Sequence, residues 1–579
     1  MEISKEDVAD YLKKRWGREK FEKFIESQTE KPSTAQYAKK SGSFIKDHWV
    51  NLLILMLLVL ITYANSYNNA FISDDIAEIV QNPNVGDFSY ILTHPFGFIR
   101  IILNWVAFHI GGLNPFFFRS FNYLFHVGNV LLIYTILNLM HSKRIALVTS
   151  ALFAIHPAIS EAVIWISGGT YPQYTFFFLL SFWLYLRSKT NTKFYWLSIV
   201  VFSFTFMSHP VMPLGLFSVF LLFEFCFGNI KKNWVRAIPY FLLAIAYVFI
   251  NLGALPERAT TLQSVHYQEK GIDNPFILIP VAISSYLELI FWPKILTLYH
   301  SELAFGTIIF LIRVVITILV AVFILANFKK NKAIFFWGSF AFISLAPTLT
   351  PFRFNWIVAE RYLYLPSLGI FTLFALGLNQ LIVRFLKYKY AIYSAFVIIL
   401  ILLGTRTIIR NIDWHNEDNL WIATGKTSPS SPNTHNNLGD VYGRQGDKQR
   451  ALQEFQTAIV LKPNYGDAYH NLANTYRELG QLDKALENYQ KAASYNPNLW
   501  QSYQNIAALY FEAKQYDLAL DNIQKAITIN PKNINLRTNL GIVYLITGDK
   551  EKAKEVFNLV LSLDPQNQLA RQGLIEAQK

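Results

Sequence analysis

The chain has 579 residues, of which 53% are hydrophobic and 16% aromatic, and its formal net charge is +13. It is too long for one ordinary domain, and its positive charge lies mostly in short loops between apolar runs. That placement is the orientation signal of membrane proteins, so the charge does not indicate a nucleic-acid-binding protein. Because Cys226 is the single cysteine, neither a disulfide nor a thiolate metal site can be built within the chain.

The N-terminal tail, residues 1–48, is polar and charged. Its scattered apolar side chains predict an amphipathic helix on the cytoplasmic membrane surface. They are Val8, Leu12, Trp16, Phe24 and Ile25. We expect no cleaved signal peptide, because the N-terminus is charged and the first apolar run, 49–64, lacks a small-residue cleavage site.

Residues 49–410 are dominated by Phe, Leu, Ile, Tyr and Trp, and many apolar runs approach the roughly 20 residues that cross a bilayer core. They predict a polytopic membrane domain of about 11 spans with its N-terminus in the cytoplasm and its C-terminus outside. We expect 276–292 to be a re-entrant or interfacial helix and 98–112 to lie along the outer surface. The basic clusters assigned to the cytoplasm are Lys143/Arg144, Arg187/Lys189/Lys193, Lys231/Lys232/Arg236, Lys329/Lys330/Lys332 and Arg384/Lys387/Lys389.

The loop after the first span is acidic. Residues 64–99 have no Lys or Arg and carry Asp74, Asp75, Glu78 and Asp87. An odd number of spans places this loop and the C-terminal region on the same, non-cytoplasmic face. Asp75 and Glu78 have the spacing of the N-cap and N3 positions of a capping box, which predicts that they open a short helix.

After residue 431 the sequence repeats with a period of 34. A helix–turn–helix unit with small, aromatic, alanine and proline positions in this order resembles the tetratricopeptide repeat (TPR). We expect a linker at 411–431, four repeats over about 432–565, and a capping helix that completes an α-solenoid over 432–579. The repeated positions are Pro429, Pro463, Pro497, Pro531 and Pro565; Tyr442, Tyr476, Tyr510 and Tyr544; Ala451, Ala485, Ala519 and Ala553; and Gly439, Ala473, Ala507 and Gly541.

An asparagine also recurs at this period, at Asn437, Asn471, Asn505 and Asn539. A carboxamide both donates and accepts hydrogen bonds, so a row of them can pair with the backbone of an extended peptide. The row resembles the asparagine ladder with which the cytosolic O-GlcNAc transferase holds its protein acceptors. The alternative is that these side chains stabilise the first helix of each repeat or are simply solvated.

Several motifs of the membrane domain, in this order and followed by TPRs, resemble the transmembrane-and-TPR O-mannosyltransferase (TMTC) family, within the GT-C glycosyltransferases. They are the Asp74-Asp75 loop, Phe153–Pro157, Glu161–Val163, Trp165–Gly168 and Ala359–Gly369. The resemblance covers nearly the whole chain from about residue 50. It implies an all-α protein with a GT-C-type transmembrane domain and a TPR α-solenoid.

The resemblance also implies the chemistry. A GT-C enzyme takes a sugar from a polyprenyl phosphate on the non-cytoplasmic side, and a carboxylate of the first outer loop deprotonates the acceptor hydroxyl. The phosphate leaves as a stable anion, so what it needs is a fixed cation. We expect Asp74 to be the base, with Asp75 as the alternative, and Arg361 to bind the phosphate. Arg361 has two other readings, a structural partner of Glu360 or an interfacial residue.

Other residues are expected to line the site. His156 and Glu161 lie in or near the third span, where ionisable groups usually face a cavity, although His156 also suits a buried, hydrogen-bonded role. The remaining expected lining residues are Glu360, Tyr171, His209 and His300. Tyr171 and His209 stand where many family members carry charged residues. We expect no metal site, since no cluster has ligand spacing, and metal dependence is left open.

Three functions are compatible with these features. The first is a protein O-glycosyltransferase whose TPR groove binds the acceptor polypeptide. The second is a GT-C transferase acting on a lipid or surface glycan, and the third is a non-catalytic TPR membrane scaffold. The Lys-, Ile-, Asn- and Phe-rich composition favours a bacterial inner membrane with a periplasmic outer face over the endoplasmic reticulum and its lumen.

Overall fold

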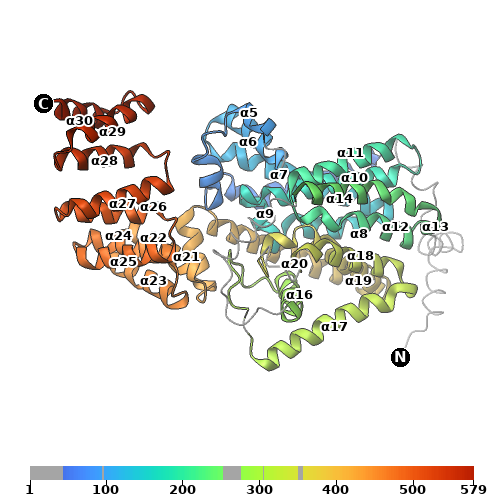
Figure 1. Cartoon of the computed structure of the whole chain (residues 1–579). Helices are drawn as coiled ribbons and strands as arrows, with labels where there is room; N and C mark the ends of the chain where they lie inside the picture. The colour runs from blue at the N-terminus through green and yellow to red at the C-terminus, as the bar shows by residue number, and fades with distance from the viewer. Residues whose placement is uncertain (1–43, 94–96, 252–274, 304, 350–355) are drawn as a thin grey trace, which may run out of the picture. The chain divides into compact units, whose positions relative to one another are not determined.

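A computed structural model describes residues 44–93, 97–251, 275–303, 305–349 and 356–579 (Figure 1). The regular secondary structure within these ranges is entirely helical, as the sequence predicts. Most of the predicted N-terminal amphipathic tail lies outside the described residues. The chain divides into two compact units, one ending at Asn419 and the other running from Leu420 to Lys579. The second unit also includes the short segment that begins at Tyr299.

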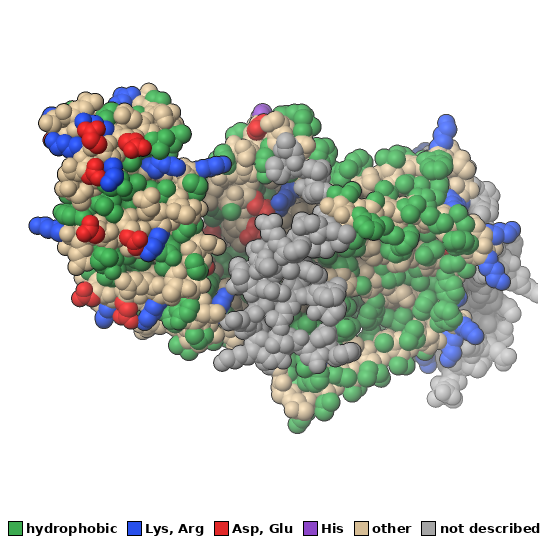
Figure 2. Space-filling model, in the orientation of Figure 1, with side chains coloured by type: hydrophobic (Ala, Val, Ile, Leu, Met, Phe, Trp, Pro, Cys, Tyr) green, Lys and Arg blue, Asp and Glu red, His purple; other side chains and the backbone are tan. Residues whose placement is uncertain are grey.

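Long apolar helices build the first unit. Six helical stretches in the described ranges are long and apolar enough to cross a bilayer, or seven if a bent pair is counted as one span. The six stretches contain α4 (Phe44–Tyr63), α7 (Pro115–Met140), α14 (Ile238–Asn251, in the stretch Ile230–Ile250), α17 (Thr307–Lys330), α19 (Pro366–Arg384) and α20 (Lys389–Asp413). The bent pair is α8 (Lys143–Ile155) with Pro157–Ile164, which includes α9 (Ser160–Ile164). Because they leave many large apolar side chains exposed, as Figure 2 shows in green, they suit a lipid environment. The chain is a multi-pass membrane protein.

Shorter helices fill the rest of this unit. They are η2 (Ile76–Val80), α5 (Phe88–Thr93), α6 (Phe98–Gly111), α10 (Thr170–Arg187), α11 (Lys193–Ser208), α12 (Phe217–Cys226), α16 (Pro275–Phe291) and α18 (Lys332–Leu345). The runs expected to be interfacial and re-entrant form α6 and α16, which belong to the short apolar class. Their position relative to a membrane stays a prediction.

Helix boundaries in this unit follow local sequence signals. Asn114 accepts a hydrogen bond from Phe116 N and precedes Pro115, whose fixed φ suits the first helical position of α7. Asn331 caps α18, since its side chain accepts hydrogen bonds from Ala333 N and Ile334 N. Pro157 stops α8, and the axis turns by 62° before α9. This bend brings the polar segment that follows α8 into the interior of the protein.

The second unit is the predicted repeat array. Its helix pairs are α22 (Pro432–Arg444) with α23 (Lys448–Leu461), α24 (Gly466–Glu478) with α25 (Leu482–Tyr495), α26 (Trp500–Glu512) with α27 (Tyr516–Ile529), and α28 (Ile534–Ile546) with α29 (Lys550–Leu563), followed by α30 (Gln568–Gln578). Four helix pairs followed by one helix are the arrangement that the 34-residue period predicts. The expected linker contains a helix of its own, α21 (Glu417–Thr427).

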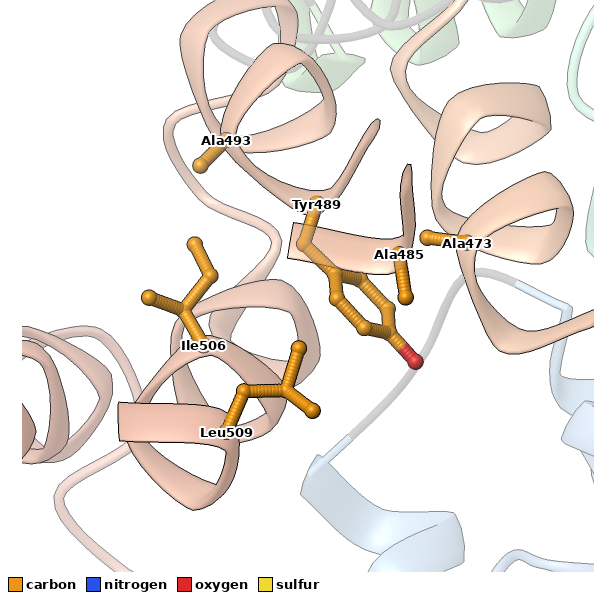
Figure 3. Close-up of a cluster of buried hydrophobic side chains, with 6 residues drawn as sticks. All are labelled: Ala473, Ala485, Tyr489, Ala493, Ile506 and Leu509. Atoms are coloured by element: carbon orange, nitrogen blue, oxygen red, sulfur yellow. The ribbon is translucent and has the colours of Figure 1, made fainter. Parts of the chain in front are cut away.

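The small residue of each repeat marks the crossing of its two helices. A Cβ added to Gly439 would lie 2.6 Å from Phe455 Cε1, and one on Gly541 would lie 2.6 Å from Phe557 Cε1. The second and third repeats carry alanine instead, and Ala473 packs in a buried cluster with Ala485 and Tyr489 (Figure 3). Close helix contact therefore explains the recurring small residue.

Candidate active site

The acidic loop places its two aspartates in different environments. Asp75 is fully buried, and its Oδ1 accepts hydrogen bonds from Ser167 N (2.8 Å) and Ser167 Oγ (2.6 Å). Its Oδ2 accepts a weaker one from Ile72 N (3.3 Å). The predicted capping box is wrong, because the Asp75 side chain makes no cap bond to η2 and is engaged by Ser167. Burial raises the pKa of Asp75 to about 7, although the bonds from Ser167 oppose this.

Asp74 is the accessible carboxylate of this pair. Although water reaches its side chain, the surrounding protein desolvates it, and this together with the Glu78 carboxylate raises its pKa. The guanidinium groups of Arg361 and Arg100 act in the opposite direction. Asp74 therefore shares one electrostatic environment with Arg361, although 287 positions separate them in the sequence.

Ser167 connects both sides of the acidic loop. Its hydroxyl lies 2.6 Å from Asp75 Oδ1 and 3.0 Å from Glu78 Oε2, and Glu78 Oε2 also accepts from Arg100 Nη1 at 2.7 Å. A hydroxyl has one proton to donate, so it can serve only one of the two carboxylates at a time. A proton on the Asp75 carboxyl group satisfies both contacts, which agrees with the raised pKa of Asp75.

Arg361 is held by a buried carboxylate. Its Nη1 lies 2.5 Å from Glu161 Oε1, and its backbone N–H donates to Glu161 Oε2 at 3.1 Å. The guanidinium carbon also lies 5.4 Å from the ring centre of Trp165 and 5.2 Å from that of Tyr362. The Arg361 side chain keeps 12% exposure, whereas Glu161 has none. The guanidinium is therefore fixed in direction and still reachable.

The alternative reading of Arg361 as the partner of Glu360 is wrong. Glu360 Oε1 instead lies 3.3 Å from Arg410 Nη2, and both side chains are fully buried. Thr297 N also donates to Glu360 Oε1, and Arg410 Nη1 contacts Asp413 Oδ2 at 3.0 Å. Glu360 therefore belongs to a buried ion-pair network rather than to the accessible site.

Arg119 is a residue that the sequence analysis missed. It is fully buried in α7, and its Nε donates to the carbonyl of Ile164 at 2.8 Å. Its terminal nitrogens donate to the carbonyls of Asn69 (2.6 Å) and Ala70 (2.9 Å), just before the acidic loop. One guanidinium thus ties the loop of Asp74 to α9. An arginine near the start of an apolar run was the available signal.

Comparisons with known proteins also find tetratricopeptide repeats in the C-terminal part, and they find relatives whose similarity extends into the membrane unit. Tetratricopeptide repeat models match residues 432–465, 466–499 and 510–578. Protein O-mannosyl-transferase F38B6.6 of Caenorhabditis elegans is 25% identical over 457 residues, which cover 72% of this chain and 63% of that protein. For Protein O-mannosyl-transferase TMTC1 of Homo sapiens the identity is 25% over 495 residues, covering 70% and 54%. The chain is a distant homologue of the TMTC protein O-mannosyl-transferases.

TMTC3 of Homo sapiens is 23% identical over 484 residues, covering 72% of this chain and 52% of that protein. The chain therefore spans between about half and two thirds of the length of these three relatives. Among solved structures, MamA from Desulfovibrio magneticus RS-1 is 21% identical, covering 26% of this chain and 85% of that chain with a TM-score of 0.24. YrrB, described as a TPR protein with an unusual peptide-binding site, is 19% identical, covering 34% and 96% with a TM-score of 0.24.

Two of the three histidines expected to line the site, His156 and His300, have other surroundings. His156 Nδ1 accepts from Ala158 N at 3.2 Å, and its Nε2 lies 2.9 Å from the Ile290 carbonyl. With both ring nitrogens engaged, His156 has the buried, hydrogen-bonded role. His300 belongs to the second unit, in the segment whose Tyr299 ring packs against Trp421.

Tyr171 and His209 pack together beside Arg361. Their ring centres are 4.9 Å apart, and Tyr171 also lies 6.0 Å from the ring of Tyr362. The His209 Nδ1 accepts from Val211 N and Met212 N, each at 3.2 Å. These aromatic rings border the Arg361 environment. Within the described ranges, no three His, Cys, Asp or Glu side chains form a cluster that could hold a metal ion.

The four ladder asparagines of the TMTC homologue are half-buried on the first helices of the repeats. Asn437 Nδ2 donates within its own helix to Asn433 O at 2.8 Å. Asn471 donates to Asn436 Oδ1 and Asn505 to Asn474 Oδ1, each at 3.1 Å. At least three of the four therefore also stabilise the array, and peptide binding by the row stays a prediction.

Proposed function

We propose that this TMTC homologue is an inverting GT-C glycosyltransferase that moves a hexose from a polyprenyl phosphate to hydroxyl groups of a polypeptide. One relationship supports the proposal: Asp74 is an accessible carboxylate, and Arg361, a fixed and reachable guanidinium, acts to lower its pKa. The TMTC relatives are named as protein O-mannosyl-transferases, which supports the reaction class and favours mannose as the sugar.

The reaction needs one base and one cation. Asp74 accepts the proton of the acceptor hydroxyl as its oxygen attacks the anomeric carbon. The bond from that carbon to the phosphate oxygen breaks on the opposite face, and the electron pair leaves with the phosphate. Arg361 stabilises the departing phosphate through charge-assisted hydrogen bonds. Because the phosphate leaves as an anion, no carboxylic acid has to protonate it, unlike in glycosidases.

Asp75 is the second candidate for the base. Its hydrogen bonds to Ser167 favour a different role, which is to fix the loop so that Asp74 faces the acceptor. A carboxylate that is already hydrogen-bonded and has no exposed surface is a poor partner for an incoming hydroxyl. Asp74 is therefore the base in the proposed mechanism.

The proposed organisation assigns catalysis to residues 49–410 and acceptor binding to the repeats at 432–579, with 411–431 between them. If α10, α11, α12 and α18 also cross the bilayer, the number of spans reaches the predicted value of about 11. The acidic loop and the repeats then share the outer face, which is the periplasm if the protein resides in a bacterial inner membrane.

The test is sugar transfer by the purified full-length protein in lipid nanodiscs, from radiolabelled polyprenyl-phosphate hexoses to host membrane extract. Asp74→Asn should abolish transfer of label into protease-sensitive material. Asp87→Asn is the matched control, since Asp87 lies in the same loop and its carboxylate contacts Ser89. Label in protease-resistant material would indicate a lipid or glycan acceptor instead. Equal activity of Asp74→Asn and wild type would exclude the proposed base.

A further inference from the structure

A polar pocket of about 470 Å³ opens beside the acidic loop and plays no part in the mechanism above. Its walls come from η2, from the turn that follows η2, and from α5 and α6. The polar side chains that line it include Glu78, Gln81, Asn84, Arg100 and Asn104. Carboxamides thus dominate its polar surface.

Of the four carboxamides that line this pocket, three have no hydrogen-bond partner among the described residues. The side chains of Gln81, Asn84 and Asn104 make no hydrogen bond to the part of the chain that the structure describes. Asn82 differs, because its Nδ2 donates to Glu78 O at 3.1 Å and its Oδ1 accepts from Asn84 N at 2.9 Å. Asn82 therefore shapes the turn, and the other three carboxamides present donors and acceptors to a ligand.

The charges in the pocket argue against an anionic ligand. Arg100 is the pocket's one lining cation among the described residues, and it is already paired with Glu78 at 2.7 Å. A phosphate would have to displace that carboxylate. Neutral carboxamides instead match a ligand that is itself rich in amide groups, each of which donates and accepts once. Val85 and Ile101 add an apolar part to the wall that suits side chains of a peptide.

The pocket also lies on the side of the base. Glu78 and Arg100 line the pocket and both act on the carboxyl group of Asp74, whereas Arg361 does not line it. In an inverting displacement the attacking oxygen and the leaving phosphate lie on opposite faces of the anomeric carbon. With the phosphate bound at Arg361, the ligand that approaches from the pocket is the acceptor.

We propose that this pocket binds the backbone of the acceptor polypeptide next to the hydroxyl that receives the sugar. This inference rests on the proposed function and adds to it an acceptor subsite within the membrane unit. Gln81, Asn84 and Asn104 pair with peptide groups on either side of the acceptor residue. The pocket thereby fixes the acceptor hydroxyl beside Asp74 independently of any contact that the repeats make.

The test measures peptide binding directly and needs no sugar donor. The probe is a short alanine-rich peptide with one threonine and a photo-reactive residue beside it, added to the full-length protein in nanodiscs. We expect cross-links within residues 77–104. Alanine at Gln81, Asn84 or Asn104 should weaken binding about fivefold for each hydrogen-bonding side chain removed. Asn68→Ala is the matched control, because Asn68 is an exposed carboxamide of the same loop outside the pocket.

The outcomes separate this inference from the proposed function. Cross-links confined to other segments would overturn the acceptor subsite even if transfer depends on Asp74. So would equal peptide binding by Asn68→Ala and by a variant with alanine at Gln81, Asn84 and Asn104 together. Cross-links in the pocket together with full transfer by Asp74→Asn would keep the subsite and reject the proposed base. The inference would also be overturned if free oligosaccharide prevented cross-linking of the photo-reactive peptide while an unlabelled copy of the peptide did not. The pocket would then be assigned to a glycan.

Discussion

Glu161 Oε1 and Arg361 Nη1 lie 2.5 Å apart, and the Glu161 side chain has no exposed surface. Removing the negative partner leaves a largely buried guanidinium uncompensated, which costs about 3–5 kcal/mol in comparable buried pairs. We expect Glu161→Gln to lower the thermal unfolding temperature and to raise the KM for the lipid-linked donor. The unfolding temperature falls because the buried guanidinium loses its partner. The KM rises because Arg361 loses the group that sets its direction.

A double variant separates these two effects. Glu161→Gln combined with Arg361→Gln replaces the ion pair by two neutral amides, so it should recover much of the unfolding temperature but no donor affinity. Thermal unfolding and donor KM would be measured on all three variants. If the double variant regained donor affinity, Arg361 would not be the phosphate ligand.

Asp75 gives the protein a pH-dependent stability. Its pKa is about 7 in the folded protein, against an ordinary value of about 3.9, so between these values the folded state binds a proton that the unfolded state lacks. Stability should therefore fall as the pH rises from about 4 to about 7. Asp75→Asn keeps an acceptor for Ser167 and cannot ionise, so its unfolding temperature should vary less across this range. Asp87→Asn should retain the wild-type slope, and an unchanged slope in Asp75→Asn would contradict the assignment.

The repeats could be predicted from the sequence because their contacts are local. Each pair of helices lies within 34 residues, so Gly439 and Phe455 are close in sequence as well as in space. The acidic loop and Arg361 were also identified in advance, by their resemblance to a family. Neither the 34-residue period nor the family resemblance predicts that the Ser167 hydroxyl contacts Asp75, since the two residues are 92 positions apart and a serine carries no distinctive signal.

Main-chain partners account for most of what the sequence did not reveal. Arg119 anchors the loop of Asp74 through carbonyl groups, and every residue has a carbonyl group, so no pattern of side chains predicts such contacts. The capping box failed for a related reason. Its spacing was correct, but a tertiary partner, Ser167, competed for the Asp75 carboxylate.

The ladder asparagines should separate into two groups when replaced. Asn505 donates to Asn474 Oδ1, so Asn505→Ala removes a hydrogen bond between repeats and should cost about 1 kcal/mol of stability. Asn539 makes no side-chain hydrogen bond among the described residues, so Asn539→Ala should leave stability unchanged. If the row binds peptide, both variants should weaken binding of an extended peptide to the full-length protein. Calorimetric binding and thermal unfolding measure the two effects, and unaltered binding by Asn539→Ala would favour a purely structural row.

The end of α20 contacts the segments that carry both halves of the proposed active site. Asn411 Nδ2 donates to Thr62 O (2.8 Å) and Asn65 Oδ1 (2.6 Å), and the carbonyl of His415 accepts from Ala70 N (2.9 Å), four residues before Asp74. One residue before Asn411, Arg410 binds Glu360, which is the neighbour of Arg361 in the sequence. The same stretch of chain thus contacts the loop of the proposed base on one side and the neighbour of the proposed phosphate ligand on the other.

Replacing Asn411 should therefore make the position of Asp74 less fixed and leave Arg361 in place. In Asn411→Ala the end of α4 and the acidic loop lose their link to α20, whereas Arg361 keeps Glu161. A small displacement of a catalytic group costs about 10- to 100-fold in rate, so kcat should fall by that factor with the donor KM unchanged. Arg410→Gln should act in the opposite way, raising the donor KM through Glu360 and Arg361. Ile409→Ala, on the exposed face of the same turn, should change neither constant, and a rise in donor KM for Asn411→Ala would show that α20 does not act on the two halves separately.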